Sequence, residues 1–286
     1  MSAFGVAMTY PPKLGIIAGA GDLPVCLARS CQERQLPYFV LALRGHADAG
    51  WLSQHPHAWV QLGSIGEVFS LLKKSDVREV VLAGAVHRPS FSDLELDWRG
   101  AKLLATLGLK ALGDDGLLRV VVAEFEKEGF RVIGAHDVLS SVMAPAGVLG
   151  DCAPDEQAWR DIWRGIDVVR SLGKLDVGQG AVVQQGIVLA VEASEGTDAM
   201  LQRCVALKKG GDGGVLVKLC KPSQDQRVDL PTLGPKTVQA AHTAGIRGIA
   251  FSSKASILVD ESLMVGTANS LGVFLVGLNA DEVLPT

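Results

Sequence analysis

Short apolar strands alternate with amphipathic helices along the first 140 residues, and this alternation limits the chain to few folds. Parallel strands need long crossover connections, which helices usually supply, so the pattern favours a mostly parallel sheet covered on both faces. The predicted strands are residues 14–18, 38–43, 58–62, 79–83 and 130–133, and the predicted helices are residues 23–34, 65–73, 98–112 and 115–128. The expected fold class is therefore α/β.

The second half of the chain keeps this alternation but adds a hairpin at Gln185 and Gly186. The predicted strands here are residues 181–184, 187–193, 215–220, 249–252, 256–259 and 273–276, and the predicted helices are residues 155–172, 197–208, 235–244 and 261–270. The composition changes over residues 140–156, which we interpret as a linker. Because 286 residues are many for one core, we expect two domains, 1–145 and 146–286.

Charge and composition exclude several classes of protein. The net charge of -4, without a Lys/Arg run, gives no electrostatic attraction to a nucleic-acid backbone. No apolar run approaches the about 18 residues of a membrane span, and the first residues lack the basic start and apolar core of a signal peptide. Five scattered cysteines without CxxC spacing indicate reduced thiols and neither a zinc site nor a disulfide framework. We therefore expect a cytoplasmic protein.

A glycine-rich corner, GAGDLP, follows the first predicted strand. Such a turn lets backbone N–H groups approach a phosphate at the positive end of the next helix. A standard nicotinamide site is disfavoured, because Pro24 replaces the third glycine and Arg44 and His46 stand where a ribose-binding carboxylate belongs. Two interpretations stay open, a tight turn that merely needs glycine and a ligand-facing corner. The candidate substrate-binding residues are Gly19, Ala20, Gly21 and Asp22.

A second glycine corner, LAGAVHRPS, ends the strand predicted over residues 79–83. In open α/β sheets, ligands gather at the carboxyl ends of the strands, so two such corners close together would form the floor of a binding cleft. Gly84, Ala85 and His87 are the candidates for substrate binding, although a histidine in this position is more often a surface residue.

The motif VEASEGTDAM in the second half offers three more candidates, Glu195, Thr197 and Asp198. One interpretation is a helix cap, in which a Thr or Asp side chain accepts backbone N–H bonds. The alternative is that these residues face the substrate beside the charged stretch that follows.

That charged stretch, KLCKPSQDQRVDLP, combines three cations with two carboxylates within twelve positions. The residues are Lys218, Lys221, Asp225, Arg227 and Asp229. Carboxylates suit Mg²⁺, which takes one or two of them together with water and phosphate oxygens. Lysine and arginine suit the negative oxygens of a diphosphate, and together with the metal they would stabilise a phosphoryl-transfer transition state. A merely solvated charged loop is the alternative.

Four segments together resemble one family, that of the LpxI-type UDP-2,3-diacylglucosamine pyrophosphatases. The segments are GIIAGAGDLP, LAGAVHRPS, VLAVEASEGTDAML and GVLVKLCKPSQDQRVDLPTLGPKTV, and the match runs in order over nearly the whole chain. The resemblance implies a Rossmann-like N-terminal domain, a smaller mixed α/β C-terminal domain and an active site between them. It also implies Mg²⁺-dependent hydrolysis of UDP-2,3-diacylglucosamine to UMP and 2,3-diacylglucosamine 1-phosphate (lipid X), in lipid A biosynthesis.

By motif match, Asp225 would carry the family's catalytic aspartate and hold the metal. We assign Arg227 and Asp229 to catalysis with it, and Lys218 and Lys221 to substrate binding. Contact with a membrane is expected to be peripheral at most, through the acylated substrate, and no oligomeric state follows from the sequence. Two alternatives are a non-catalytic carrier of a nucleotide sugar or acyl lipid, and a nicotinamide-dependent reductase, which Pro24 disfavours.

Overall fold

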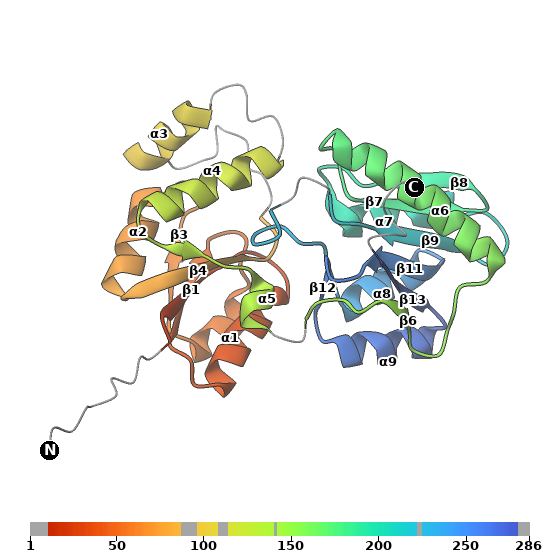
Figure 1. Ribbon diagram of the computed structural model, residues 1–286, viewed down its shortest axis with the longest axis horizontal. Coiled ribbons are helices and arrows are strands. Elements are labelled where there is room, and N and C mark those ends of the chain that lie inside the picture. The colour runs from red at the N-terminus through yellow and green to blue at the C-terminus, as the bar shows by residue number, and fades with distance from the viewer. Residues whose placement is uncertain (1–10, 87–95, 108–113, 140–141, 222–224, 280–286) are drawn as a thin grey trace, which may run out of the picture. The chain divides into compact units, whose positions relative to one another are not determined.

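The computed structural model describes residues 11–86, 96–107, 114–139, 142–221 and 225–279, and the chain divides into two compact units (Figure 1). The first unit comprises Met1–Lys110 and Val120–Val138, and the second comprises Ala111–Arg119 and Leu139–Thr286. Within the described ranges, no helix is both long enough and apolar enough to cross a membrane.

The first unit is built on a five-stranded parallel sheet in the order β3-β2-β1-β4-β5. Its strands are β1 (Lys13–Ala18), β2 (Tyr38–Leu43), β3 (His57–Val60), β4 (Val77–Ala83) and β5 (Arg131–Val132). The helices of this part of the chain are α1 (Leu23–Glu33), the 3₁₀ helix η1 (Ala49–Gln54), α2 (Ile65–Lys74), α3 (Trp98–Leu107), α4 (Asp114–Lys127) and α5 (Ala135–Val138). The chain steps outward from β1 to β2, then returns from β3 to β4, so the strand order reverses between β1 and β4. This is the doubly wound arrangement of Rossmann-like domains.

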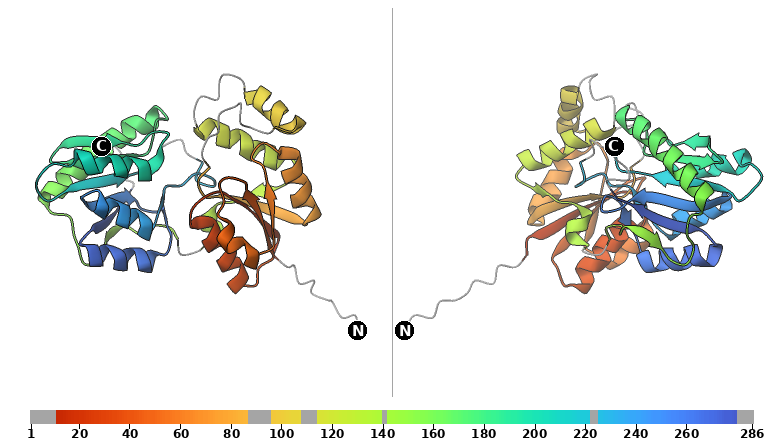
Figure 2. Two further views of the ribbon diagram at one scale, coloured as in Figure 1. Left: turned by 180° about the vertical axis from the view of Figure 1, so that it is seen from behind. Right: turned by 45° about the vertical axis from the view of Figure 1, so that its right-hand side comes forward.

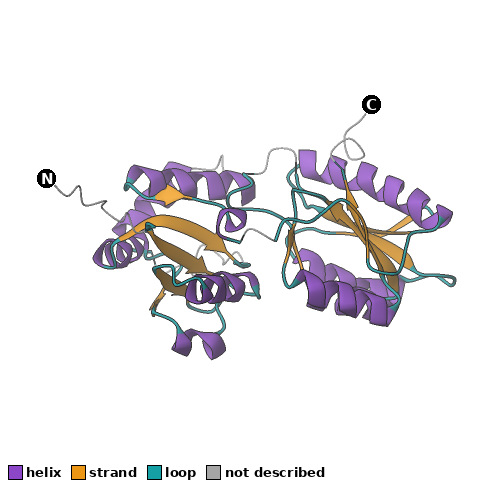
Figure 3. Ribbon diagram, turned by 60° about the horizontal axis from the view of Figure 1, so that its bottom comes forward, coloured by secondary structure: helices purple, strands orange, loops and turns teal. Residues whose placement is uncertain are grey.

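Burial in this unit follows from that winding. Because the crossovers through α1 and α2 step in opposite directions and are both right-handed, the two helices lie on opposite faces of the sheet. On one face, Leu27 and Cys31 of α1 are fully buried, as the apolar spacing of that helix predicts. On the other face, Phe69 of α2 packs against Phe125 of α4 and Phe130, with ring centroids 5.2 and 6.0 Å away. The predicted two-sided cover of the sheet is confirmed (Figure 3).

The second unit is built on a six-stranded mixed sheet in the order β6-β13-β11-β9-β7-β8, with a short parallel pair, β10-β12. Its strands are β6 (Gly147–Leu149), β7 (Gly180–Gln184), β8 (Ile187–Val191), β9 (Gly214–Lys218), β10 (Thr232–Leu233), β11 (Ile246–Ser252), β12 (Ile257–Leu258) and β13 (Phe274–Leu278). Its helices are α6 (Glu156–Lys174), α7 (Gly196–Leu207), α8 (Pro235–Thr243) and α9 (Glu261–Leu271). Strands β9, β11 and β13 are parallel to one another, while β6 and β7 run antiparallel to their neighbours.

Helices cover both faces of the second sheet (Figures 2 and 3). On one face, Ile162 and Ile166 of α6 pack with Val215 and Val217 of β9. On the other face, α7, α8 and α9 enclose a core that includes the fully buried Phe251. The result is a three-layer sandwich with the mixed sheet in the middle.

The expected fold class is confirmed, with a parallel sheet in the first unit and a mixed sheet in the second. The C-terminal part is mixed as expected, but its sheet is the larger of the two, with six strands against five. The interpretation of residues 140–156 as a linker was wrong for most of that stretch. Ala144 is fully buried in the second core, and β6 pairs antiparallel with β13. Strand β6 was missed for two reasons. Three residues among Pro and Gly are too few to show an apolar alternation, and the partner strand β13 is distant in sequence.

Candidate active site

The two glycine corners lie side by side at the carboxyl ends of adjacent strands, β1 and β4. The N–H of Gly19 donates to the carbonyl of Ala83 at 2.8 Å, and Ala20 and Ala85 exchange N–H···O bonds of 2.8 and 2.9 Å. The strand order reverses between these two strands, which is where ligands bind in doubly wound sheets. The expectation that the two corners lie near one another is therefore confirmed.

Close packing explains two of the glycines. A Cβ on Gly19 would lie 2.5 Å from the carbonyl oxygen of Ala85, and a Cβ on Gly84 would lie 2.5 Å from that of Ala20. Gly84 also has a φ of +89°, which disfavours other residues. Because the N–H groups of Gly19 and Ala20 already bond to carbonyls, these two groups are not available to a phosphate.

Of the predicted residues of this corner, Gly21 has the most open surroundings. Gly21 is exposed, has a φ of +96°, and a Cβ there would meet nothing within 4 Å. Asp22 occupies the N-cap position of α1, but its side chain makes no capping hydrogen bond. His87, the other candidate from the corners, lies outside the described residues. Substrate contact by any of these residues stays a prediction.

In the second unit, β8, β9, β11 and β13 all end at one edge of the sheet, which we call the carboxyl edge. Helices α7, α8 and α9 begin there, because each returns the chain to the start of the next of these strands. A helix N-terminus carries a partial positive charge and unsatisfied N–H groups, and both favour anions. The carboxyl edge is therefore suited to a phosphate-bearing ligand.

Lys218, the last residue of β9, forms a buried ion pair with Glu192 at this edge. Its Nζ lies 3.1 and 3.3 Å from the two carboxylate oxygens, and both side chains are less than a tenth exposed. The ammonium also donates to Oγ1 of Thr197, which in turn donates to Glu192 at 2.7 Å. Lys218, Thr197 and Glu192 are therefore hydrogen-bonded to one another. The direct substrate contact expected of Lys218 and Thr197 stays a prediction.

Asp225 and Arg227 form a compact turn. The guanidinium donates through Nε and Nη2 to the two carboxylate oxygens at 3.0 and 2.7 Å, and the N–H of Arg227 donates to Oδ1 at 3.0 Å. The hydrogen bonds from the Arg227 side chain hold the pKa of Asp225 below its ordinary value, against a smaller opposing effect of burial. The N–H of Asp229 donates to the carbonyl of Asp225 at 3.1 Å. Asp225 is therefore ionised at neutral pH and is hydrogen-bonded to Arg227 and Asp229, whose catalytic role stays a prediction.

The remaining candidates of this half are also paired or exposed. Nζ of Lys221 lies 2.6 Å from Oδ1 of Asp176, with the lysine side chain 8% exposed. Glu195 precedes α7 and accepts a hydrogen bond from Arg203. Asp198 is exposed in the first turn of α7, where a negative charge complements the helix dipole. The interpretation of Thr197 or Asp198 as a helix cap was wrong, because the N-cap of α7 is Glu195 and no side chain there makes a capping hydrogen bond.

Asp225 is the candidate magnesium ligand, and its hydrogen bonds limit what it can offer. A carboxylate has about four lone-pair positions. Oδ1 accepts two of the bonds described above and Oδ2 accepts one, which leaves a position on Oδ2. Among the described residues, no group of three or more His, Cys, Asp or Glu side chains is arranged to hold a metal ion. These residues fit a hard cation that arrives with phosphate oxygens and keeps most of its water, and they do not form a metal cage.

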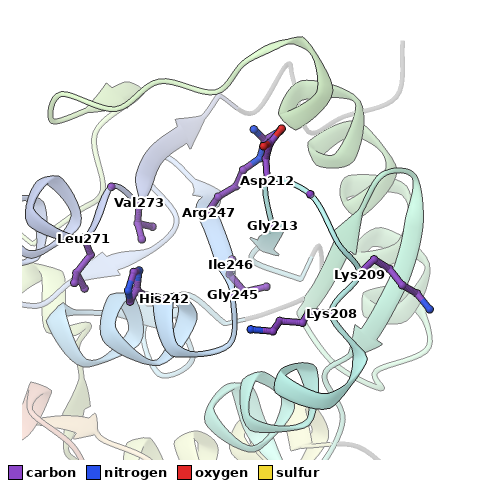
Figure 4. Close-up of a pocket in the computed structure, with 12 residues that line it drawn as sticks. Lys208, Lys209, Asp212, Gly213, His242, Gly245, Ile246, Arg247, Leu271 and Val273 are labelled. Atoms are coloured by element: carbon purple, nitrogen blue, oxygen red, sulfur yellow. The ribbon is translucent and has the colours of Figure 1, made fainter.

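A pocket of about 400 Å³ lies at the opposite edge of the second sheet, where β9, β11 and β13 begin (Figure 4). Its lining includes Lys208, His242 and Arg247. Lys208 and His242 stand at the ends of α7 and α8, where cations are favoured by the negative end of the helix dipole. The basic lining thus has a structural explanation, and no predicted site residue that the structure describes lines this pocket.

Two carboxylates of the carboxyl edge were missed from the sequence, Glu192 and Asp176. Each neutralises a lysine of the charged stretch. A signal was available for Glu192, because it falls inside the strand predicted over residues 187–193, where a buried carboxylate needs a cation or several hydrogen-bond donors. Asp176 follows the end of α6 and gave no comparable signal.

Comparison with known proteins agrees with this arrangement of two domains and their motifs. The family model of the LpxI N-terminal domain matches residues 13–142, and that of the LpxI C-terminal domain matches residues 145–276. The chain is 45% identical over 277 residues to the UDP-2,3-diacylglucosamine pyrophosphatase LpxI of Caulobacter vibrioides, covering 94% of this chain and 99% of the relative. Among solved structures, CobK precorrin-6A reductase is similar over 94% of this chain and 88% of its own, with 11% identity and a TM-score of 0.35, too weak a likeness to support an argument. The chain belongs to the LpxI family.

Proposed function

We propose that this protein hydrolyses the diphosphate of UDP-2,3-diacylglucosamine to UMP and 2,3-diacylglucosamine 1-phosphate (lipid X), in lipid A biosynthesis. The observation that carries the proposal is the identity of 45% with the Caulobacter pyrophosphatase, which extends over 94% of this chain and 99% of that protein. So complete a match includes both the glycine corners and the charged stretch.

The chemistry of the carboxyl edge supports this reaction. Hydrolysis places water on one phosphorus and releases the other phosphate, so negative charge moves onto phosphate oxygens. Three helix N-termini at this edge favour that charge. The guanidinium of Arg227, which donates two hydrogen bonds to Asp225, also places positive charge at this edge. Asp225 is a weak general base because its pKa is lowered, so we assign it to electrostatic positioning and metal binding.

Mg²⁺ is the cofactor that we propose, held by Asp225 together with the substrate. When bound, the ion would neutralise charge on the diphosphate oxygens. Treatment with a chelator should abolish turnover, and Mg²⁺ alone should restore it. Restoration by a transition metal and not by Mg²⁺ would contradict a hard-cation site at Asp225.

The test of the function is release of UMP over time with UDP-2,3-diacylglucosamine in large excess over protein. Many turnovers per molecule are expected. Binding without release of UMP would identify a non-catalytic carrier instead, and a nicotinamide absorbance in the purified protein would favour a reductase. We further propose a cytoplasmic enzyme that contacts the membrane only through its acylated substrate. Recovery of all activity in the membrane fraction after a high-salt wash would contradict this.

A further inference from the structure

Two segments that follow β9 and β11 at the carboxyl edge are joined by hydrogen bonds near both of their ends. We call residues 218–233 the charged segment and residues 252–258 the serine segment. At one end, the N–H of Cys220 donates to Oγ of Ser252 at 3.2 Å. At the other end, the N–H of Ile257 donates to the carbonyl of Pro231 at 2.8 Å, and β10 pairs with β12. Asp225 and Lys254 therefore belong to neighbouring segments of one edge.

The cations of these two segments differ in how they are neutralised. Lys218, Lys221 and Arg227 each have a carboxylate partner, Glu192, Asp176 and Asp225 respectively. Lys254 is exposed, and its ammonium has no hydrogen bond or ion pair within the part of the chain that the structure describes. A diphosphate needs positive charge that is not already compensated. Among the four cations of these two segments, Lys254 supplies such uncompensated positive charge.

The backbone of Lys254 is also unusual. Its φ is +56°, a left-handed conformation that costs energy for a lysine. The conformation is fixed by its neighbours, because the N–H of Lys254 donates to the carbonyl of Ala144 at 2.8 Å and that of Ser253 to the carbonyl of Leu278 at 2.8 Å. The lysine therefore stands at the carboxyl end of β11, a central strand, on a backbone held from both sides.

We propose that Lys254 binds a phosphate group of the substrate, as an anion contact that acts beside the Asp225–Arg227 turn. The inference rests on the proposed function for the identity of the substrate. Lys254 adds attraction to a charge that is present before and throughout the reaction, so it contributes to affinity and not to the chemical step. No motif marks it in the sequence, because a lone lysine after a strand resembles any surface lysine.

The test compares Lys254→Asn with Lys254→Arg and with a control. Asparagine removes the charge but tolerates the left-handed backbone, so the variant should fold with an unchanged Tm. Arginine keeps the charge and should restore binding. Lys208→Asn is the matched control, since Lys208 is an exposed lysine at the opposite edge of the same sheet. Two quantities are measured for each protein, the Kd for UDP-2,3-diacylglucosamine by calorimetry and the steady-state kcat and KM.

Loss of a hydrogen bond to a charged group should weaken binding by about 10- to 100-fold. We expect Kd and KM of Lys254→Asn to rise by that factor with kcat within about threefold of wild type, while Lys254→Arg and Lys208→Asn stay near wild type. An unchanged Kd in Lys254→Asn would overturn the inference even if wild type turns over substrate. If the Kd depends on Lys254 but the wild-type protein releases no UMP, the proposed phosphate contact holds and the proposed hydrolytic function is wrong.

Discussion

The two edges of the C-terminal sheet make opposite use of the same helices. At the carboxyl edge, α7, α8 and α9 begin, and the charged segment carries Asp225 and Arg227. At the opposite edge, the same helices end around a pocket of about 400 Å³ lined by basic residues. The helix dipoles at the edge with this pocket therefore repel anions, whereas those at the carboxyl edge attract them.

A pocket alone is therefore a poor indication of an anion site, because the helix ends around it can carry the unfavourable charge. The basic groups at the opposite edge compensate helix ends, whereas Lys254 at the carboxyl edge compensates nothing that the described residues contain. A phosphate-bearing substrate should therefore be sensitive to changes at one edge and indifferent to changes at the other. Paired substitutions of the same kind at the two edges test this directly.

The largest effect on stability is expected from Glu192→Ala at the carboxyl edge. Removing Glu192 leaves the buried ammonium of Lys218 without its charge partner, which typically costs about 3–5 kcal/mol in the free energy of unfolding. Urea denaturation measures this. Asp212→Ala, an exposed carboxylate at the opposite edge, should change the free energy by no more than about 0.5 kcal/mol. Equal effects of the two variants would remove the distinction between the edges.

The largest effect on activity is expected from Asp225→Asn. Withdrawing one charge from a transition state that develops charge typically lowers turnover by about 10²–10³-fold, or roughly 3–4 kcal/mol. The fold should be nearly intact, because a part-exposed ion pair such as Asp225–Arg227 contributes only about 0–1 kcal/mol to stability. UMP release and Tm are measured together, at saturating Mg²⁺.

Asp212→Asn is the control for this substitution at the opposite edge, and it should leave UMP release unchanged. Near-normal release in Asp225→Asn would return the charged segment to the status of a solvated loop. A large decrease in Tm would instead make Asp225 a structural residue.

The smallest effect is expected at the opposite edge, from Asp155→Asn. Asp155 caps α6 and forms two hydrogen bonds of 2.7 and 2.8 Å with Arg247, which chiefly lower its pKa from 3.8 to about 2. Since the folded pKa is the lower one, the pair stabilises the protein above about pH 3.8, and this contribution is lost as the pH falls towards 2. Asparagine still caps a helix, so the variant isolates the ion pair. The difference in Tm from wild type should be small and constant at neutral pH and should shrink below pH 5, with activity unchanged. A difference that grows on acidification would contradict the assignment.

Most of the fold could be predicted from the sequence, because its elements have strong local patterns. Strand β2 is found over the residues predicted, and α1 begins at Leu23 as Asp22 and Pro24 indicate. Short elements without a local pattern were missed. Strand β6 exists only because β13 is there to pair with it, and β10 exists only beside β12.

The site could be predicted only in part, because spacing in sequence does not give the order of strands in a sheet. The charged stretch and the glycine corners were recognisable from their composition. The ion pair that neutralises Lys218 could not be recognised, because Glu192 lies 26 positions earlier in the chain. Nor could Lys254 be assigned, because its place at the carboxyl edge depends on β11 being the parallel neighbour of β9.

The hydrogen bonds that tie the charged segment to the serine segment have a consequence for the entropy of binding. A free loop must be ordered when substrate arrives, and each immobilised side chain costs about 0.5–1.5 kcal/mol of affinity. Here hydrogen bonds fix the backbone at Cys220, at Pro231 and from Asp225 to Asp229 before any ligand is present. Much of the entropic cost of ordering these residues is therefore incurred during folding and not during binding. Less of the attraction between protein and diphosphate is then offset, so the affinity is higher.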